Sequence, residues 1–309
     1  MGSAPAFGQH TAVGLVGLGL MGTGMARNLL ARGHRLHVWA RRAGAARPLA
    51  EAGAVDAGSL AALGAACELV ITCVDDDAAV EQVLFGEGGL ASALRAGSCI
   101  VDCSTIAADS ARGFARRLAE RGIGFLDAPV SGGQQGAADG TLGCMVGGEA
   151  DQVERCRPVL QAFCKAITHV GANGAGQTVK SCNQVAVAAA MLGVADAIAL
   201  ARKQGVDPNV MREVLLGGTS RSLVLERMAP RLIANDFRPG FRARLMRKDL
   251  RIALASAKAV GAELPVATLA ESMVDATCQN GRADWDWGAV VLEVQRRSGM
   301  AIPDEPSAS

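Results

Sequence analysis

The sequence predicts an α/β fold in which a domain built on a parallel sheet precedes an all-helical C-terminal domain. Up to about residue 171, short apolar runs alternate with helical stretches, which is typical of parallel strands joined by crossover helices. Beyond that point the sequence contains helical patterns and no strand pattern. A long alanine-rich helix, from Gly174 to about Gln204, joins the two halves.

The individual elements follow from apolar runs and from the glycine and proline residues that interrupt them. In the first half we expect strands at 12–17, 35–40, 68–74, 98–104, 122–128, 142–148 and 166–171, with a helix at 21–33. In the second half we expect helices at 174–204, 208–217, 221–234, 243–261, 265–280 and 286–297. The predicted domains are 11–171 and 172–300, with loose tails at 1–10 and 301–309.

Composition excludes some partners. The 309 residues, 50% of them hydrophobic, can bury a large core, and 31 basic against 30 acidic residues leave a net charge of +1. Such a balance provides no attraction for nucleic acid or an anionic membrane. The apolar run from Val185 to Ala195 ends at Asp196, short of the roughly 18 residues that a membrane span needs. We therefore expect neither a nucleic-acid nor a membrane partner.

Few residues can transfer protons at neutral pH. There is no tyrosine, and the 4 histidines are scattered. The 9 cysteines form no CxxC pair and show no zinc spacing, so we expect no metal site. We therefore expect reduced, mostly buried thiols and a cytoplasmic protein.

The segment Gly17-Leu18-Gly19-Leu20-Met21-Gly22 fits the pattern GxGxxG between a predicted strand and a predicted helix. The first glycine permits a tight turn, the second lets backbone approach a pyrophosphate, and the third lets helix and strand pack closely. The helix N-terminus then faces the phosphates. The strand, spacing and helix together favour a dinucleotide site over a glycine turn without a ligand.

The end of the second predicted strand indicates which dinucleotide binds. An NAD site carries an acidic residue there. Here the strand is followed by Arg41 and Arg42, and no carboxylate occurs between Gly22 and Glu51. Two arginines suit the 2′-phosphate of NADP through charge-assisted hydrogen bonds, whereas the alternative is a pair of solvated side chains. We expect NADP, with NAD as the other candidate.

Lys180, Asn183 and Gln184 lie at i, i+3 and i+4 of the long helix and therefore share a face. A lysine on an apolar face is costly to bury without a partner, and burial lowers its pKa towards the range useful in acid/base catalysis. A lysine that extends to solvent is the alternative. From these residues alone both interpretations stay open.

Ser131-Gly132-Gly133 follows a predicted strand and presents a hydroxyl and exposed backbone N–H groups. Such a loop is a natural cradle for a small carboxylate, although an ordinary glycine turn has the same composition.

Five motifs in order resemble the beta-hydroxyacid dehydrogenase family, which includes 3-hydroxyisobutyrate dehydrogenase and tartronate semialdehyde reductase. They are GLGLMGTGMARNL, DCSTI, DAPVSGG with GTLGCMVGG, GAGQTVKSCNQ and FRARLMRKDL. The similarity runs from about Val13 to Arg297, nearly the whole chain. It implies a Rossmann-type first domain and a helical second domain joined by a long interdomain helix.

The resemblance also implies roles for single residues. Lys180 matches the family's catalytic lysine, with Asn183 orienting the substrate beside it. The Ser131 loop matches the substrate-carboxylate loop. Thr105 matches a position beside the nicotinamide, and Lys248 matches a C-terminal lysine that reaches the cofactor.

Four departures from the family pattern stand out. Gln184 replaces a second asparagine as a substrate-binding residue, and it can still donate and accept hydrogen bonds. Val74 and Asp75 replace the Leu-Pro of a loop that normally lies against the cofactor, and Asp76 and Asp77 follow. In addition, Ala40 stands where NADP-using members carry an asparagine, and the proline usual after the fourth main strand is absent.

The implied function is reversible hydride transfer between NADP and a small 3-hydroxy acid or its semialdehyde, such as 3-hydroxyisobutyrate or tartronate semialdehyde. Lys180 would act as general acid/base without a metal, in a homodimer or homotetramer. An imine reductase of the same fold is one alternative, but such enzymes resemble this family with the lysine replaced. A non-catalytic cofactor-binding scaffold is the other, and it predicts loss of the lysine or of the Ser-Gly-Gly loop.

Overall fold

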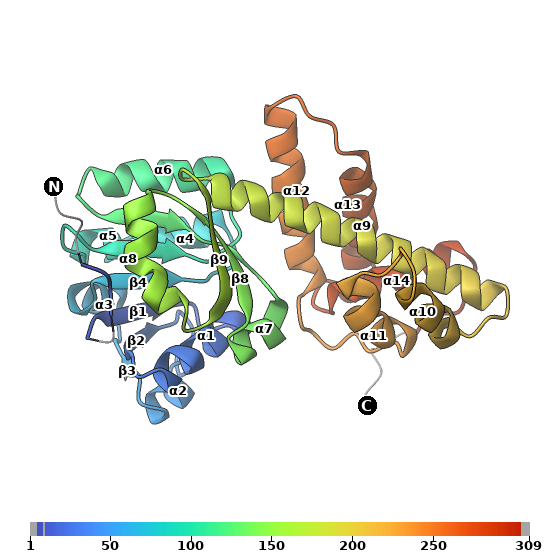
Figure 1. Ribbon diagram of the computed structural model, residues 1–309, viewed down its shortest axis with the longest axis horizontal. Coiled ribbons are helices and arrows are strands. Elements are labelled where there is room, and N and C mark those ends of the chain that lie inside the picture. The colour runs from blue at the N-terminus through green and yellow to red at the C-terminus, as the bar shows by residue number, and fades with distance from the viewer. Residues whose placement is uncertain (1–4, 9, 304–309) are drawn as a thin grey trace. The chain divides into compact units, whose positions relative to one another are not determined.

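The computed structural model describes residues 5–8 and 10–303 (Figure 1). The chain forms two compact units, which divide between Lys180 and Ser181. The first contains a sheet covered by helices and the second is helical, so the predicted fold class is confirmed.

A 9-stranded sheet forms the centre of the first unit, in the order β3-β2-β1-β4-β5-β6-β8-β7, with β9 paired to β8. Its strands are β1 (Ala12–Val16), β2 (Arg35–Trp39), β3 (Val55–Asp56), β4 (Leu69–Thr72), β5 (Cys99–Asp102), β6 (Gly124–Asp127), β7 (Val130–Ser131), β8 (Leu142–Gly147) and β9 (Cys164–Gly171). Every predicted strand forms. The two that we did not predict, β3 and β7, are two residues long, too short to produce a periodic pattern.

The expectation that these strands pair in parallel is wrong at β8. The pairs from β3 through β6 are parallel, and so is the pair β8–β9, but β8 runs antiparallel to β6 and β7. Only Ala128 and Pro129 separate β6 from β7, and the short helix α7 (Gly133–Asp139) then leads into β8. The chain therefore returns beside β6 and β7 instead of crossing a face of the sheet, and short returns of this kind produce antiparallel pairs.

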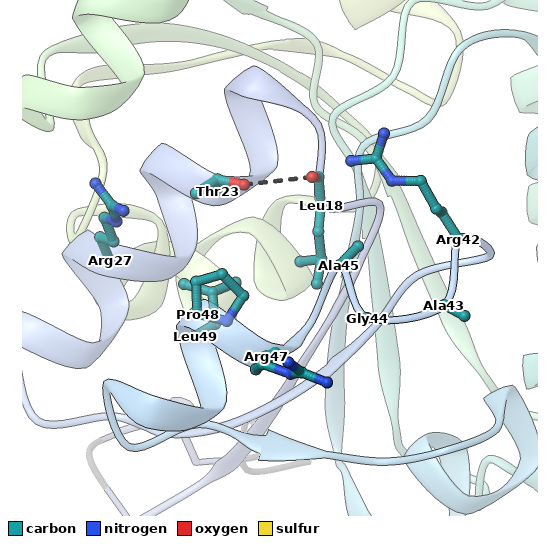
Figure 2. Close-up of a pocket in the computed structure, with 10 residues that line it drawn as sticks. All are labelled: Leu18, Thr23, Arg27, Arg42, Ala43, Gly44, Ala45, Arg47, Pro48 and Leu49. Atoms are coloured by element: carbon teal, nitrogen blue, oxygen red, sulfur yellow. Dashed lines mark hydrogen bonds between the residues drawn. The ribbon is translucent and has the colours of Figure 1, made fainter.

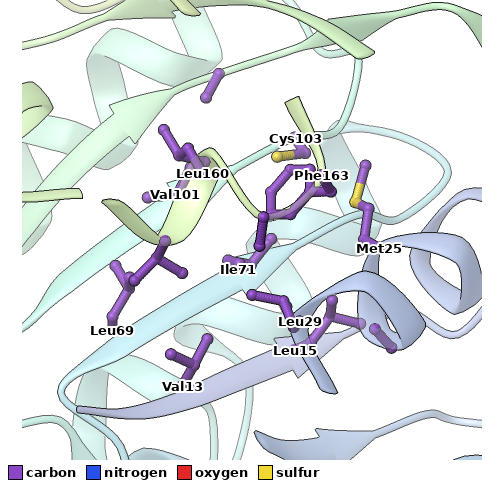
Figure 3. Close-up of a cluster of buried hydrophobic side chains, with 14 of the residues drawn as sticks. Val13, Leu15, Met25, Leu29, Leu69, Ile71, Val101, Cys103, Leu160 and Phe163 are labelled. Atoms are coloured by element: carbon purple, nitrogen blue, oxygen red, sulfur yellow. The ribbon is translucent and has the colours of Figure 1, made fainter. Parts of the chain in front are cut away.

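Helices pack against the sheet of the first unit and bury both of its faces. They are α1 (Leu20–Ala31), α2 (Arg47–Glu51), α3 (Leu60–Ala66), α4 (Asp77–Phe85), α5 (Leu90–Ala93), α6 (Ala108–Ala119), α7 and α8 (Ala150–Leu160). Leu15 and Ile71 pack with Phe163 in one apolar cluster (Figure 3), whereas Val16 and Val70 belong to another. Because alternate strand residues point to opposite faces, continuous apolar strands are what a sheet buried on both faces requires.

The prediction of a loose N-terminal tail is wrong at Phe7. Its side chain is 3% exposed within the core of the first unit, its N–H donates to Arg155 O at 2.9 Å, and the Arg155 guanidinium lies over its ring. At the other end, Ile302 packs against the core of the second unit. Within the predicted tails, residues 1–4, 9 and 304–309 lie outside the described residues.

The second unit is built from α9 (Ala175–Lys203), α10 (Pro208–Leu216), η1 (Val224–Met228), α11 (Ala229–Ile233), α12 (Ala243–Ala259), α13 (Pro265–Thr277), η2 (Cys278–Arg282), η3 (Trp287–Ala289) and α14 (Val290–Arg297); the first turns of α9 belong to the first unit. Among the described residues of this unit there is no strand, only a bridge between Arg242 and Asp286. Its core includes Met191, Phe237 and Trp287. Thus every helix expected in this half is found.

By length and composition α9 could cross a membrane. Its most apolar stretch has a mean hydropathy of 1.9, because Asp196 interrupts the run without making it polar. This is weak evidence, since the core helix of a soluble protein passes the same test, and 44% of the stretch is buried within the structure.

Candidate active site

The glycines of the first turn have the geometry that GxGxxG predicts. Gly17 has a φ of +97°, and a Cβ there would lie 2.1 Å from Cys73 O. A Cβ on Gly22 would lie 1.9 Å from Gly17 O, so helix and turn touch through backbone. At Gly19 no atom lies within 4 Å of the place that a Cβ would take, which leaves room for a ligand against the backbone. The turn therefore fits a dinucleotide pyrophosphate.

Beside this turn lies a pocket of about 610 Å³ that is rich in arginine (Figure 2). Arg27 from α1, Arg42 from the loop after β2 and Arg47 at the start of α2 line it, and no carboxylate is among its lining residues. Leu18 and Thr23 connect the pocket to the glycine turn, where the Thr23 hydroxyl donates to Leu18 O at 3.3 Å. Of the two predicted arginines, Arg42 lines this pocket and Arg41 does not.

The acidic residues after β4 have structural partners. Asp76 caps α4 by accepting from Ala79 N at 2.8 Å, and Asp77 accepts from Ala107 N at 3.0 Å. The N–H of Val74 donates to Ser104 Oγ at 2.9 Å. The loop that contains Val74 and Asp75 is thus tied to the loop after β5, and two of its carboxylates are used in that architecture.

Gln177 clamps the loop around Thr105. Its Nε2 donates to Ser104 O at 2.8 Å and its Oε1 accepts from Ile106 N at 3.2 Å, so the two bonds flank Thr105. Gln177 is 1% exposed and lies three residues before Lys180 on α9. The loop after β5 is therefore fixed by two hydrogen bonds to α9, the helix that carries Lys180.

Asp127, at the end of β6, anchors the start of α9. Its carboxylate accepts from Gly174 N at 2.8 Å and from Gln177 N at 3.0 Å. These N–H groups have no partner within the helix, so the carboxylate caps it from a distance in sequence. Burial raises the pKa of Asp127, and the two backbone donors oppose that rise.

Lys180 is buried and points at the predicted substrate loop. The residue is 7% exposed, and its Nζ donates to Val130 O at 2.9 Å. Val130 directly precedes Ser131, and Gly132 and Gly133 follow with φ angles of +131° and +63°. An L-residue rarely adopts such angles, so the loop shape depends on glycine. The first unit thus brings together a lysine, a serine hydroxyl and exposed backbone.

The remaining predicted residues lie in the second unit. Asn183 Nδ2 donates to Gln184 Oε1 at 2.8 Å, and Gln184 Nε2 donates to Asp249 Oδ2 at 2.7 Å. Lys248 Nζ lies 3.2 Å from Asp249 Oδ1. Asp249 is 2% exposed, so a buried carboxylate joins the two predicted amides to the predicted C-terminal lysine.

Sequence reasoning missed four of the residues that shape these sites, Arg27, Arg47, Gln177 and Asp249, and assigned no role to Asp127. Gln177 and Asp249 lie within quoted motifs, next to residues that we did assign, but their partners are distant in sequence. Among the described residues, no group of three or more His, Cys, Asp or Glu side chains could hold a metal ion.

A mainly parallel sheet, a glycine turn that fits a pyrophosphate and an adjoining arginine pocket are typical of a dinucleotide-binding oxidoreductase. Residues 12–171 match the family model described as the NAD binding domain of 6-phosphogluconate dehydrogenase. Residues 174–294 match the model described as NAD-binding of NADP-dependent 3-hydroxyisobutyrate dehydrogenase.

Known proteins resemble the chain over nearly its whole length. The 2-hydroxy-3-oxopropionate reductase of Escherichia coli is 42% identical over 283 residues, 92% of this chain and 97% of that protein. The crystal structure of 3-hydroxyisobutyrate dehydrogenase from Salmonella typhimurium has a TM-score of 0.85 at 31% identity, covering 92% of this chain and 99% of the other. A structure of Psf3 in complex with NADP+ and 2-OPP has a TM-score of 0.85 at 29% identity, covering 91% and 99%.

The chain belongs to the beta-hydroxyacid dehydrogenase family, and it is an NAD(P)-dependent enzyme of that family.

Proposed function

We propose that the enzyme transfers hydride reversibly between NADP(H) and C3 of a small 3-hydroxy acid or its semialdehyde, with Lys180 as general acid/base. The observation that carries the proposal is the bond from Lys180 Nζ to Val130 O, which holds the amine beside the Ser131 loop. The two relatives named for their substrates act on 2-hydroxy-3-oxopropionate and 3-hydroxyisobutyrate, short acids with the reacting oxygen on C3.

Lys180 can hold its position in both protonation states. An ammonium and a neutral amine each have an N–H for Val130 O, and the neutral amine keeps a lone pair. During oxidation this lone pair would take the proton of the substrate hydroxyl as the C–H electron pair leaves carbon. During reduction the ammonium would return the proton to the carbonyl oxygen. The nicotinamide, when bound, supplies or accepts the hydride.

The Ser131 loop would bind the carboxylate of the substrate. The Ser131 hydroxyl and the backbone N–H groups of Gly132 and Gly133 are donors, and both glycines are exposed. Binding the carboxylate one residue from Val130 places the far end of a short acid near Nζ. This supports a substrate of a few carbon atoms, with Asn183 and Gln184 contributing to its orientation.

Three arginines and no carboxylate around the pocket beside the glycine turn support NADP over NAD. A 2′-phosphate there would gain charge-assisted hydrogen bonds, each worth roughly 1.5–3 kcal/mol. We propose Arg42, Arg47 and Arg27 as its ligands in place of Arg41, the other arginine of the sequence-based prediction, because Arg41 does not line the pocket.

The test is turnover of a panel of 3-hydroxy acids and semialdehydes with both cofactors. We expect activity on short acids with an oxidisable C3, and a higher kcat/KM with NADPH than with NADH. Corresponding amides, which lack the carboxylate, should show a strongly raised KM. Turnover of imines but of no 3-hydroxy acid or semialdehyde would instead identify an imine reductase.

We propose a cytoplasmic location and a symmetric assembly. All nine cysteines are free thiols, which fits a reducing compartment such as the cytoplasm. For the assembly we propose a homodimer or homotetramer, and light scattering on the purified protein would distinguish these from a monomer.

A further inference from the structure

A row of three polar side chains in the second unit, two of them buried, has a defined direction. It runs from Asn183 through Gln184, which is 4% exposed, to Asp249, which is 2% exposed. An amide has a donor end and an acceptor end of similar shape, so the direction of the row depends on what stands at its terminus.

A carboxylate at the terminus permits one direction only. Asp249 Oδ2 can only accept, so Gln184 must turn its Nε2 towards it, at 2.7 Å. Gln184 Oε1 then faces Asn183, which must donate through Nδ2, at 2.8 Å. Oδ1 of Asn183 is thereby turned away from the row as an acceptor. The ammonium of Lys248, 3.2 Å from Asp249 Oδ1, compensates the buried negative charge.

We infer that Asp249 is a positioning residue that sets the amide orientation of Asn183 through Gln184. The inference rests on the proposed function in one respect, namely that Asn183 contacts the substrate. The proton of the reacting hydroxyl goes to Lys180, so an acceptor in this position suits a second donor on the substrate, such as the C2 hydroxyl that 2-hydroxy-3-oxopropionate carries. A flipped amide would offer N–H groups to that hydroxyl and would leave its proton without an acceptor.

The decisive variant is Asp249→Asn, which keeps shape and size but adds a donor. In the variant the amide oxygen at position 249 would face the ammonium of Lys248 and its N–H groups would face Gln184, which favours the reversed row. We expect kcat/KM for a substrate that carries the C2 hydroxyl to fall about tenfold, the value of one hydrogen bond, with the melting temperature and the cofactor Kd nearly unchanged. The matched control is Asp196→Asn, an exposed carboxylate on α9 of the same unit, which should behave as the parent enzyme.

A double-mutant cycle tests whether Asp249 acts through Asn183. If it does, Asp249→Asn in an Asn183→Ala background lowers kcat/KM by no more than about twofold, the usual scatter of additive effects. If the separate losses multiply, or if Asp249→Asn alone has parental activity, the inference is overturned.

Side-chain amide NMR provides a readout that requires no substrate. With ¹⁵N-labelled glutamine, assigned from the signal lost in Gln184→Met, the Nε2 protons should exchange slowly in the parent and faster in Asp249→Asn. Unchanged exchange overturns the inference. A parent with the protected signal but no turnover of any hydroxy acid contradicts the proposed function and leaves the oriented row intact.

Discussion

The two portions of α9 hold their polar side chains by different means. In its first turns, which belong to the first unit, Lys180 donates to a backbone carbonyl at the end of the sheet, and Asp127 from β6 fixes the helix start. In its later turns, which belong to the second unit, Gln184 is held by the side chain of Asp249, 65 residues away in sequence.

The two portions differ in whether a single substitution can remove the acceptor of these hydrogen bonds. The carbonyl of Val130 is an acceptor whatever residue stands at 130, and the pairing of β7 with β8 determines its position. The acceptor for Gln184 exists only while residue 249 is a carboxylate. The first portion of α9 is thus held rigidly by the sheet, whereas the second portion depends on one residue for the direction of its hydrogen bonds.

The largest expected effect comes from removing the group that the first portion holds. Lys180→Ala should lower kcat by about 10²–10⁴-fold, the usual contribution of a general acid/base, with cofactor binding nearly intact. Steady-state kinetics and cofactor titration measure the two effects. The control is Lys165→Ala, an exposed lysine on β9. Parental kcat in Lys180→Ala would remove the lysine from the chemistry.

The second largest expected effect comes from removing Asp127, which anchors the start of α9. Asp127→Ala leaves the N–H groups of Gly174 and Gln177 without their acceptor, and each buried unpaired donor costs about 1–3 kcal/mol. We expect the free energy of unfolding to fall by about 2–4 kcal/mol in urea titrations. Asp151→Ala, an exposed carboxylate in the first turn of α8, should change it by less than about 0.5 kcal/mol. Equal losses in both would show that Asp127 is no special anchor.

The third effect compares neighbouring arginines in the first unit. Arg42→Ala and Arg47→Ala should each raise KM for NADPH about tenfold and leave KM for NADH nearly unchanged, since each removes one bond to the 2′-phosphate. Arg41→Ala is the matched control, because Arg41 does not line the pocket. If Arg41→Ala is the one variant that lowers the preference for NADPH over NADH, the sequence-based choice of Arg41 is right and the pocket is not the 2′-phosphate site.

The smallest effect concerns Asp102, at the end of β5 beside Asp127. Burial raises its pKa from 3.8 to about 6, while bonds from Thr72 and Ser104 oppose the rise. Between these values the folded state binds more protons than the unfolded state, so this group's contribution to stability falls as pH rises from about 4 to about 6 and is constant above.

Asp102→Asn removes this titration. The free energy of unfolding of the parent, minus that of the variant, should therefore be larger at pH 5 than at pH 7. Urea titrations at both pH values measure the difference, in which the other carboxylates cancel. Parallel pH dependence in the two proteins would show that Asp102 does not titrate in this range.

Much of the site could be predicted because its elements are local. The glycine turn is recognisable within six consecutive residues, although a side chain on Gly17 would clash with the distant backbone of Cys73 and only one on Gly22 would clash with the turn itself, at Gly17 O. Lys180 and the Ser131 loop were recognised from motifs, each of which lies within a short segment.

The anchors and the pocket could not be predicted, since their partners are far apart along the chain. Nothing near Gln184 indicates that a carboxylate on α12 receives its amide, and nothing near Arg42 indicates that Arg27 of α1 shares its pocket. The antiparallel return of β8 was missed for a similar reason, because strand direction depends on the path of the chain through β7 and α7.

By itself, the sequence determined the order of the seven longer strands and of the C-terminal helices, the dinucleotide turn and, through the family resemblance, the choice of Lys180 as the proposed acid/base, because hydrophobic periodicity, backbone sterics and short motifs each act over a few residues. Only the tertiary structure decided which carboxylate caps α9, which arginines surround one pocket and which way the amide of Asn183 points. Those outcomes depend on hydrogen bonds and charges that act over a few ångströms in space, between residues that folding alone brings together.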